Sequence, residues 1–256
     1  MIMITIRHYK KIYPWVLIGW LGTFAFCTSS SSNSHSESSS GDGAVTSSLN
    51  RFAIIGNNLY AGNTNLLSIF DITNPAQPVS LNQVTTSTMI ETVFPYQNNL
   101  LLGSSTGLYI YDLINPQLPG FVSSYVHFTA CDPVVAANNV AFVTLRSGCG
   151  QSLNELHVLD ISNINSPVLL QVYPMTLPGG LFLDGNLLFV ADDSAGLKIY
   201  NILINNVLSL RENIALSAVD VIADNATGTL YIVDKGGIYL YDYTTNPVTF
   251  ISRLTY

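Results

Sequence analysis

A short apolar phrase that ends in Asp or Asn recurs five times along this chain. It reads Ile69-Phe70-Asp71-Ile72, Ile110-Tyr111-Asp112-Leu113, Val158-Leu159-Asp160-Ile161, Ile199-Tyr200-Asn201-Ile202 and Leu240-Tyr241-Asp242-Tyr243. The Asp or Asn stands at positions 71, 112, 160, 201 and 242, so successive repeats are 41, 48, 41 and 41 residues apart. A repeat of about 40 residues built from short strands is typical of a β-propeller with one four-stranded blade per repeat. The spacing therefore predicts an all-β fold, a five-bladed β-propeller of four-stranded antiparallel blades.

The fourth repeat shows the expected order of strands within a blade. Apolar runs over residues 180–184, 187–191, 197–202 and 207–215 are separated by turns rich in Gly, Asn and Asp, which accept positive φ. The runs are apolar on both faces, as is usual for a sheet that neighbouring layers cover on both sides. Each repeat accounts for its own four strands, so closure of the ring would rest on packing of the first blade against the last; an open arc of blades is the alternative.

We interpret the acidic residue of the repeated phrase as structural. A short carboxylate at the end of a strand can accept hydrogen bonds from backbone N–H groups in the turn that follows. The prolines that come soon after fix φ and lack an N–H, which stops the strand. Because the acid recurs from blade to blade, we interpret it as a turn cap rather than as a catalytic or metal-binding residue; the caps are Asp71, Asp112, Asp160 and Asp242.

The first 50 residues have the composition of an export leader and a spacer. Arg7, Lys10 and Lys11 form a basic segment, and residues 14–26 form an apolar run of 13 residues, too short to span a bilayer comfortably. Residues 28–50 are rich in Ser and cannot bury apolar area, so they predict a flexible tether. We therefore divide the chain into a signal peptide (1–27), a tether (28–50) and a propeller (51–256).

Cys27 closes the apolar run of the leader and resembles the lipobox cysteine of bacterial lipoproteins. The resemblance implies that the thiol of Cys27 carries a lipid and becomes the new N-terminus. Phe26 departs from the small residue that this pattern has before its cysteine. The alternative is an uncleaved or ordinarily cleaved signal peptide in which Cys27 is incidental, and both interpretations predict export to the cell envelope.

Charge argues against nucleic acid as a partner. Beyond Cys27 the chain has sixteen acidic and six basic residues, a formal charge of −10. Such a negative field repels phosphate backbones. The only membrane contact expected is through the N-terminal lipid or signal anchor.

Several segments of the chain resemble the LVIVD-repeat proteins. The similarity lies in Leu108-Tyr109-Ile110-Tyr111-Asp112 and Val158-Leu159-Asp160-Ile161-Ser162-Asn163. It also includes Cys131-Asp132-Pro133-Val134-Val135, which lies between these two segments where the second repeat passes into the third. It covers residues 51–256, and Asn201 departs from the Asp that the pattern prefers. The resemblance implies a bacterial, exported and often lipid-anchored propeller, and it assigns no ligand.

Beyond Cys27 only Cys131 and Cys149 remain, and two cysteines in an exported protein predict one disulfide. Two buried free thiols or a metal pair are the alternatives. Arg146 precedes Cys149 in the segment that lengthens one repeat step to 48 residues, and we consider it a possible ligand contact. His157 occupies the third-strand position that Ser68, Tyr109, Lys198 and Tyr239 hold in the other repeats, which favours an ordinary surface or interblade role.

No G-x-S-x-G elbow, H-E-x-x-H or phosphate-binding loop occurs in the sequence. We therefore expect a non-enzyme without cofactors, a monomer that acts as a binding or adhesion module for a protein or glycan at the cell envelope. The alternatives are a periplasmic assembly or scaffold subunit and a cation-dependent hydrolase that uses acidic loops.

Overall fold

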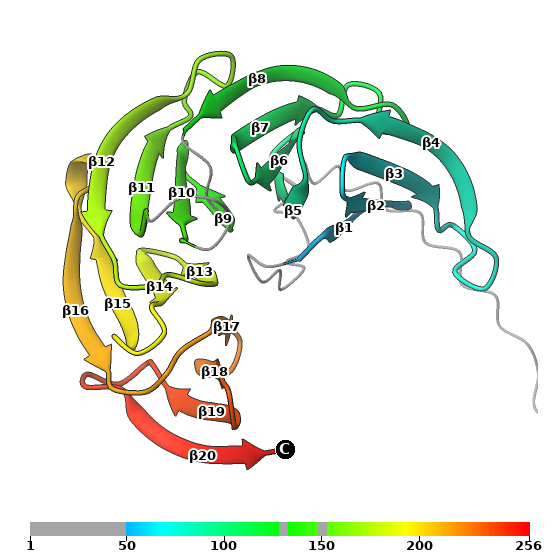
Figure 1. Ribbon diagram of the computed structural model, residues 1–256. Coiled ribbons are helices and arrows are strands. Elements are labelled where there is room, and N and C mark those ends of the chain that lie inside the picture. Colours follow the sequence, from blue (N-terminus) through cyan, green and yellow to red (C-terminus); the bar gives the residue numbers. More distant parts are fainter. Residues whose placement is uncertain (1–49, 128–132, 148–152) are drawn as a thin grey trace, which may run out of the picture. The chain divides into compact units, whose positions relative to one another are not determined.

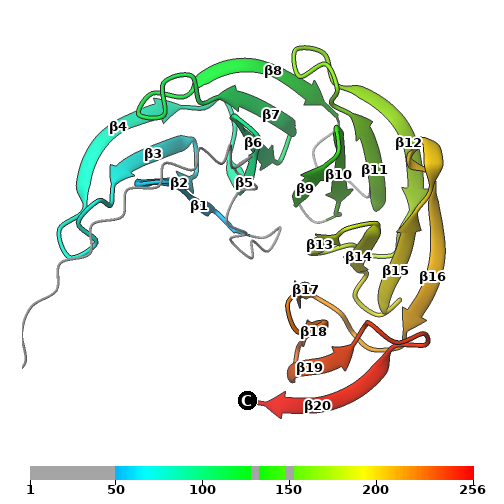
Figure 2. The same cartoon turned by 180° about the vertical axis from the view of Figure 1, so that it is seen from behind.

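The protein folds into five four-stranded antiparallel sheets, as the repeats predict. The computed structural model describes residues 50–127, 133–147 and 153–256. In every sheet the strands lie in the order in which they occur along the chain, so each sheet is a simple meander and forms one blade. Figures 1 and 2 show the five blades following one another around an arc, with the fourth strand of each blade on the outside. The predicted fold class is confirmed.

Each blade takes its four strands from one sequence repeat. Blade 1 holds β1 (Phe52–Ile55), β2 (Asn58–Asn63), β3 (Leu66–Asp71) and β4 (Val79–Thr85). Blade 2 holds β5 (Ile90–Tyr96), β6 (Asn99–Ser104), β7 (Gly107–Asp112) and β8 (Gly120–Val126). Blade 3 holds β9 (Val134–Ala137), β10 (Val140–Leu145), β11 (Glu155–Asp160) and β12 (Val168–Pro174). Blade 4 holds β13 (Leu181–Asp184), β14 (Leu187–Ala191), β15 (Leu197–Ile202) and β16 (Leu208–Ile214), and blade 5 holds β17 (Asp220–Asp224), β18 (Thr229–Asp234), β19 (Gly237–Asp242) and β20 (Thr249–Thr255).

The turns between first and second strands use residues that tolerate positive φ. Gly185 has φ +53° between β13 and β14, and Asn138 and Asn139 have φ +50° and +65° between β9 and β10. These backbone angles match the twist of a two-residue hairpin, and Gly and Asn adopt them at the lowest steric cost. The turns therefore follow directly from the Gly and Asn residues of the sequence.

The repeated acid lies at the end of the third strand and bonds to the turn that follows. In four blades its Oδ1 accepts a hydrogen bond from the backbone N–H two residues later: Thr73 to Asp71 at 2.7 Å, Ile114 to Asp112 at 3.1 Å, Ser162 to Asp160 at 2.8 Å and Thr244 to Asp242 at 2.9 Å. Hydrogen bonds from the side chain and backbone of the partner lower the pKa of Asp71, Asp160 and Asp242. These contacts are those of a turn cap.

Apolar packing between consecutive blades forms the core. The buried side chains fall into four clusters, one at each junction between neighbouring blades. Hydrogen bonds cross the same junctions. The hydroxyl of Tyr60 in blade 1 donates to the carbonyl of Pro116 at 2.9 Å, and that of Tyr243 in blade 5 donates to Oδ2 of Asp184 at 2.6 Å. Each inner blade is thus covered on both faces, as its two-sided apolar strands require.

The burial of one position of the third strand shows whether a blade is covered by the next blade. The residue two places before the repeated Asp or Asn points toward the next blade, and it is fully buried in blades 1 to 4 as Ile69, Ile110, Val158 and Ile199. Its equivalent in blade 5, Leu240, is only half-buried. On the opposite flank, Phe52 and Ile54 of β1 are 54% and 51% exposed. Blades 1 and 5 therefore each bury one face only.

In the described part of the chain, each blade packs against the blades that precede and follow it in the sequence. The first strands contact in the series β1, β5, β9, β13 and β17, and no comparable packing joins blade 1 to blade 5. Both views show these two blades at the ends of the arc. Of the closed ring and the open arc that the sequence left as alternatives, the described blades therefore form the open arc. The strands of each blade are complete without a partner from the other end, so hydrogen bonding between strands does not demand closure.

No helix in the described ranges is long and apolar enough to cross a membrane. The predicted signal peptide, Cys27 and the tether lie outside the described residues, as do Cys131 and Cys149.

The matched pair Ile110→Ala and Leu240→Ala tests the difference between covered and uncovered faces. Ile110 is fully buried at the junction of blades 2 and 3, so we expect Ile110→Ala to lower the free energy of unfolding by about 2–4 kcal/mol through lost burial and a cavity. Leu240→Ala is expected to cost about 1 kcal/mol, because solvent already reaches that side chain. Chemical denaturation of both variants measures the difference, and equal losses would contradict an uncovered face on blade 5.

Candidate functional site

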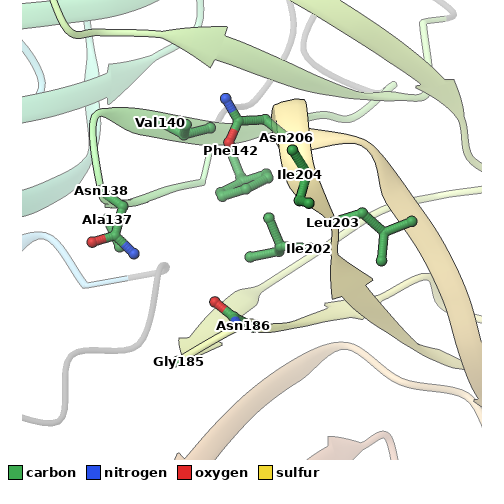
Figure 3. A pocket seen from close by; sticks show the side chains of 10 residues that line it. All are labelled: Ala137, Asn138, Val140, Phe142, Gly185, Asn186, Ile202, Leu203, Ile204 and Asn206. Atoms are coloured by element: carbon green, nitrogen blue, oxygen red, sulfur yellow. The ribbon is translucent and has the colours of Figure 1, made fainter.

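A cavity of about 280 Å³ lies between blades 3 and 4, at the end of the strands that carries the turns between first and second strands. Figure 3 shows the side chains around it. The lining residues are Ala137, Asn138, Val140, Phe142, Gly185, Asn186, Ile202, Leu203, Ile204 and Asn206. A concave, mostly apolar site with a few polar groups is the usual form of a ligand pocket.

The cavity forms where the fourth repeat departs from the others. Asn201 replaces the turn-capping acid, and no proline follows it. A short 3-10 turn, η1 (Ile204–Asn206), takes the place of the capped turn, and Asn205 and Asn206 have φ +64° and +62°. The altered turn carries Leu203 and Ile204 at its tip, where they are 48% and 89% exposed.

The cavity has an apolar floor and a rim of amides. Val140 and Phe142 of β10 are buried, and Ile202 at the end of β15 lies opposite them. The side chains of Asn138, Asn186 and Asn206 are spaced around this floor, as Figure 3 shows. Within residues 50–127, 133–147 and 153–256, none of these three amides makes a side-chain hydrogen bond, and no charged residue lines the cavity. The site thus offers donors and acceptors without a net charge.

A second cavity of about 280 Å³ lies at the same end of the strands, between blades 2 and 3. Its lining residues are Asn98, Asn99, Asp112, Ile114, Val122, Ile164 and Asn165. The turn cap Asp112 is therefore part of the lining of this second cavity. The two cavities therefore differ in charge: Asp112 lines the second, whereas none of the described residues that line the first is ionised.

A polar cluster lies at the other end of the strands, between blades 2 and 3. His157 of β11 is only 5% exposed. Its Nδ1 lies 3.0 Å from the hydroxyl of Tyr125 in β8, and its Nε2 lies 2.7 Å from Oε2 of Glu155. The His127 ring lies 6.3 Å from that of His157. Both imidazole nitrogens are therefore engaged, and the chain of three side chains ties one blade to the next.

Burial controls the protonation of His157. Loss of hydration lowers its pKa below the usual 6.5, the hydrogen bond and charge of Glu155 act in the opposite direction, and His127 adds to the lowering. The imidazole is therefore neutral at pH 7, accepting from Tyr125 and donating to Glu155. Of the surface and interblade positions expected for His157, the structure shows the interblade one, but the polar cluster around it was missed. Its one sequence signal is the two-residue spacing of Glu155 and His157, which puts both on one face of a strand.

Blade 4 contains a buried ion pair near the same end of the strands. Asp192 is fully buried, and its Oδ2 lies 2.6 Å from Nζ of Lys198. The backbone N–H of Leu177 donates to its Oδ1 at 2.8 Å, and that of Thr176 donates to the same carboxylate. Asp192 therefore anchors the connection from blade 3 into blade 4, and its oxygens are already satisfied.

The residues singled out from the sequence do not converge on one site. Asp112 lines the second cavity, whereas Asp71, Asp160 and Asp242 line neither. Arg146 follows β10 at the opposite end of that strand from Asn138; it is half-buried and lines neither cavity. The described residues contain no group of three His, Cys, Asp or Glu side chains that could hold a metal ion.

Comparison with known proteins agrees with the repeat pattern and the fold. The LVIVD repeat model matches residues 50–86 and 150–174, so the chain carries LVIVD repeats. No curated protein matches the sequence.

Among solved structures, a functionally unknown protein from Desulfotomaculum acetoxidans superposes with a TM-score of 0.66 at 12% identity, over 80% of this chain and 69% of that one. The periplasmic gluconolactonase PpgL of Pseudomonas aeruginosa gives 0.63 at 10% identity, over 78% and 67%. The computationally designed protein Ika8 gives 0.59 at 13% identity, over 79% of this chain and 60% of its own length. At such identities the likeness concerns the fold alone, which is propeller-like.

Acidification tests the neutral state of His157. Because the pKa of His157 is lowered in the folded protein, the unfolded chain takes up the proton first as the pH falls below about 6.5. This part of the stability is present above that pH, declines as the pH falls, and levels off once folded His157 is protonated. We expect the wild type to lose more thermal stability between pH 7 and pH 5 than His157→Gln does. Equal losses in the two melting curves would contradict the assignment.

Removal of the partner of Asp192 is expected to be costly. Lys198→Met leaves a buried carboxylate without its cation, so we expect the free energy of unfolding to fall by about 3 kcal/mol. Lys235→Met is the matched control, because Lys235 is 75% exposed at 3.8 Å from Asp193 and its loss is expected to cost under about 0.5 kcal/mol. Denaturant titration of both variants decides the matter, and a similar small loss in each would show that the buried pair is not needed.

Proposed function

We propose that this protein is an exported, membrane-tethered binding module of the cell envelope, which holds its ligand without chemical change. The observation that carries the proposal is the uncharged, amide-rimmed cavity between blades 3 and 4. It lies where one repeat abandons a turn that the other four keep, so it is a local feature added to the repeated scaffold. Binding and catalytic residues usually lie on such connecting segments, held in place by a rigid framework.

The chemistry of the cavity supports binding over catalysis. General acid–base catalysis needs a group that gains or loses a proton near the working pH, and nucleophilic catalysis needs an activated hydroxyl, thiol, amine or carboxylate. The described lining residues supply hydrocarbon and amide groups. Such groups can position a ligand and hydrogen-bond to it. They transfer no proton and form no covalent intermediate.

The leader supports the location. Its basic segment, its short apolar run, Cys27 and the Ser-rich spacer occur in the order of an export signal, an anchor and a tether. A lipid on Cys27 would hold the propeller close to a membrane, while the spacer leaves it free to meet a ligand.

A scaffold role is the second candidate, and the outer strand of blade 3 favours it. Val168, Leu169, Leu170 and Val172 of β12 are 53%, 39%, 41% and 42% exposed. The other outer strands place polar or charged residues at their centres, whereas β12 has only Gln171 there. A long apolar edge strand is a recognised docking surface for another protein.

Protease treatment of intact cells tests the location and the tether together. We expect the wild-type propeller to fractionate with membranes and Cys27→Ser to appear in a soluble exported fraction, because the variant lacks the thiol that receives the lipid. Digestion in intact cells would place the domain on the outer surface, and digestion only after the outer envelope is opened would place it in the periplasm. Cleavage only after complete lysis, or a wild-type protein in the cytosolic fraction, would overturn the proposal.

A further inference from the structure

We infer that the cavity between blades 3 and 4 binds an uncharged peptide segment, with one aliphatic side chain on the floor and neighbouring peptide groups on the asparagine rim. The inference rests on the proposed binding function and names the chemistry of the ligand. It concerns the site lined by Val140, Phe142 and Ile202 below and by Asn138, Asn186 and Asn206 around the rim.

The charge of the ligand follows from the lining. An ion that leaves water for a mostly apolar cavity needs an opposite charge or several strong hydrogen bonds, and without them the transfer is costly. Among the described residues, the cavity between blades 3 and 4 has no ionised side chain in its lining. The second cavity, between blades 2 and 3, has Asp112 in its lining. The cavity between blades 3 and 4 therefore favours a neutral ligand over an ion.

The rim matches the hydrogen-bonding pattern of a peptide group. An Asn side chain carries a carbonyl acceptor and an NH₂ donor side by side, and a peptide group presents one N–H and one C=O. The side chains of Asn138, Asn186 and Asn206 have no hydrogen bond to the described residues, so all three remain able to pair with a ligand. Three amides spaced around the floor can serve the peptide groups on both sides of one residue.

The floor matches an aliphatic side chain. Phe142 is 1% exposed and Val140 is 4% exposed, so both are held rigidly by the packing between blades 3 and 4. Ile204 is 89% exposed beside them at the tip of η1, although a large apolar side chain gains by being covered. A Leu, Ile or Val side chain placed on the floor would also contact Ile204. Its burial would supply most of the binding energy, while the amides would set its orientation.

A sugar fits this lining less well. Each hydroxyl that loses water needs a hydrogen-bond partner, or its desolvation is left uncompensated. Seven of the ten lining residues are apolar and three are amides, so several hydroxyls of a sugar ring would face hydrocarbon. A peptide has an apolar group for the floor and polar groups for the rim, which is the division that the cavity shows.

The direct test is titration of the purified full-length protein with the blocked peptide acetyl-Gly-Leu-Gly-amide, followed by NMR of the asparagine side-chain amides. We expect saturable shifts of the amides of Asn138, Asn186 and Asn206. Acetyl-Gly-Glu-Gly-amide and acetyl-Gly-Lys-Gly-amide are expected to bind at least about tenfold more weakly, because the cavity offers no counter-charge. N-acetylglucosamine serves as the sugar probe.

Two isoleucines provide matched variants that need not disturb folding. Ile204→Glu puts a carboxylate beside the cavity at an 89% exposed position, and we expect it to weaken binding of the leucine peptide by about tenfold or more. Ile114→Glu makes the same change at an 83% exposed residue of the second cavity and is expected to leave binding unchanged.

The outcomes separate the ligand class from the proposed function. Saturable binding of the leucine peptide that is lost only in Ile204→Glu would support the inference. Binding of N-acetylglucosamine in its place, or peptide binding that Ile114→Glu weakens equally, would overturn the inference and leave a binding module with another ligand. No binding of any probe would also overturn the peptide assignment, whereas the envelope location is decided independently by the protease experiment.

Discussion

Packing of one blade on the next is the interaction on which the rest of this structure depends. The strands carry apolar side chains on both faces, and a single four-stranded sheet cannot hide both from water. Burial of one Leu, Ile or Val side chain contributes roughly 1.5–3 kcal/mol, and each of the four junctions contains a cluster of such residues. No blade can therefore be stable alone. The inner blades, which are covered on both faces, gain the most stability from this packing.

The same packing explains where a site can form. Within a junction the buried side chains pack against one another, whereas at the ends of the strands the turns decide how closely two blades meet. Blade 2 ends its third strand with Asp112, which bonds to the following turn, and blade 4 has Asn201 and a 3-10 turn at that place. The altered turn of blade 4 supplies Leu203, Ile204 and Asn206 to the lining of the cavity between blades 3 and 4. A small departure from the repeat thus alters the chemistry of one cavity while the framework around it stays the same.

Much of the fold can be predicted from the sequence because its determinants are local and repeated. The 41-residue spacing, the Gly and Asn turns and the acids that cap them each act within a few residues of their own position. The cavity could not be predicted in this way, because its walls come from two repeats. Asn138 lies in a turn of blade 3, whereas Asn186 and Ile204 lie in two different turns of blade 4. The link between Tyr125 and His157 likewise joins two repeats. Asn201 was visible as a departure from the pattern, but its consequence depends on the neighbouring blade. Closure of the ring depends on the rotation between blades, which no local motif encodes.

Hydrogen exchange measured strand by strand tests the central claim most directly. If packing between blades provides the stability, amides of β6, β10 and β14, whose blades are covered on both sides, should exchange more slowly than those of β2 and β18 in the terminal blades. The account predicts a gradient of protection that is highest in blade 3 and falls toward blades 1 and 5. Equal protection in all five blades would contradict it, because the outer faces of blades 1 and 5 would then have to be covered as well.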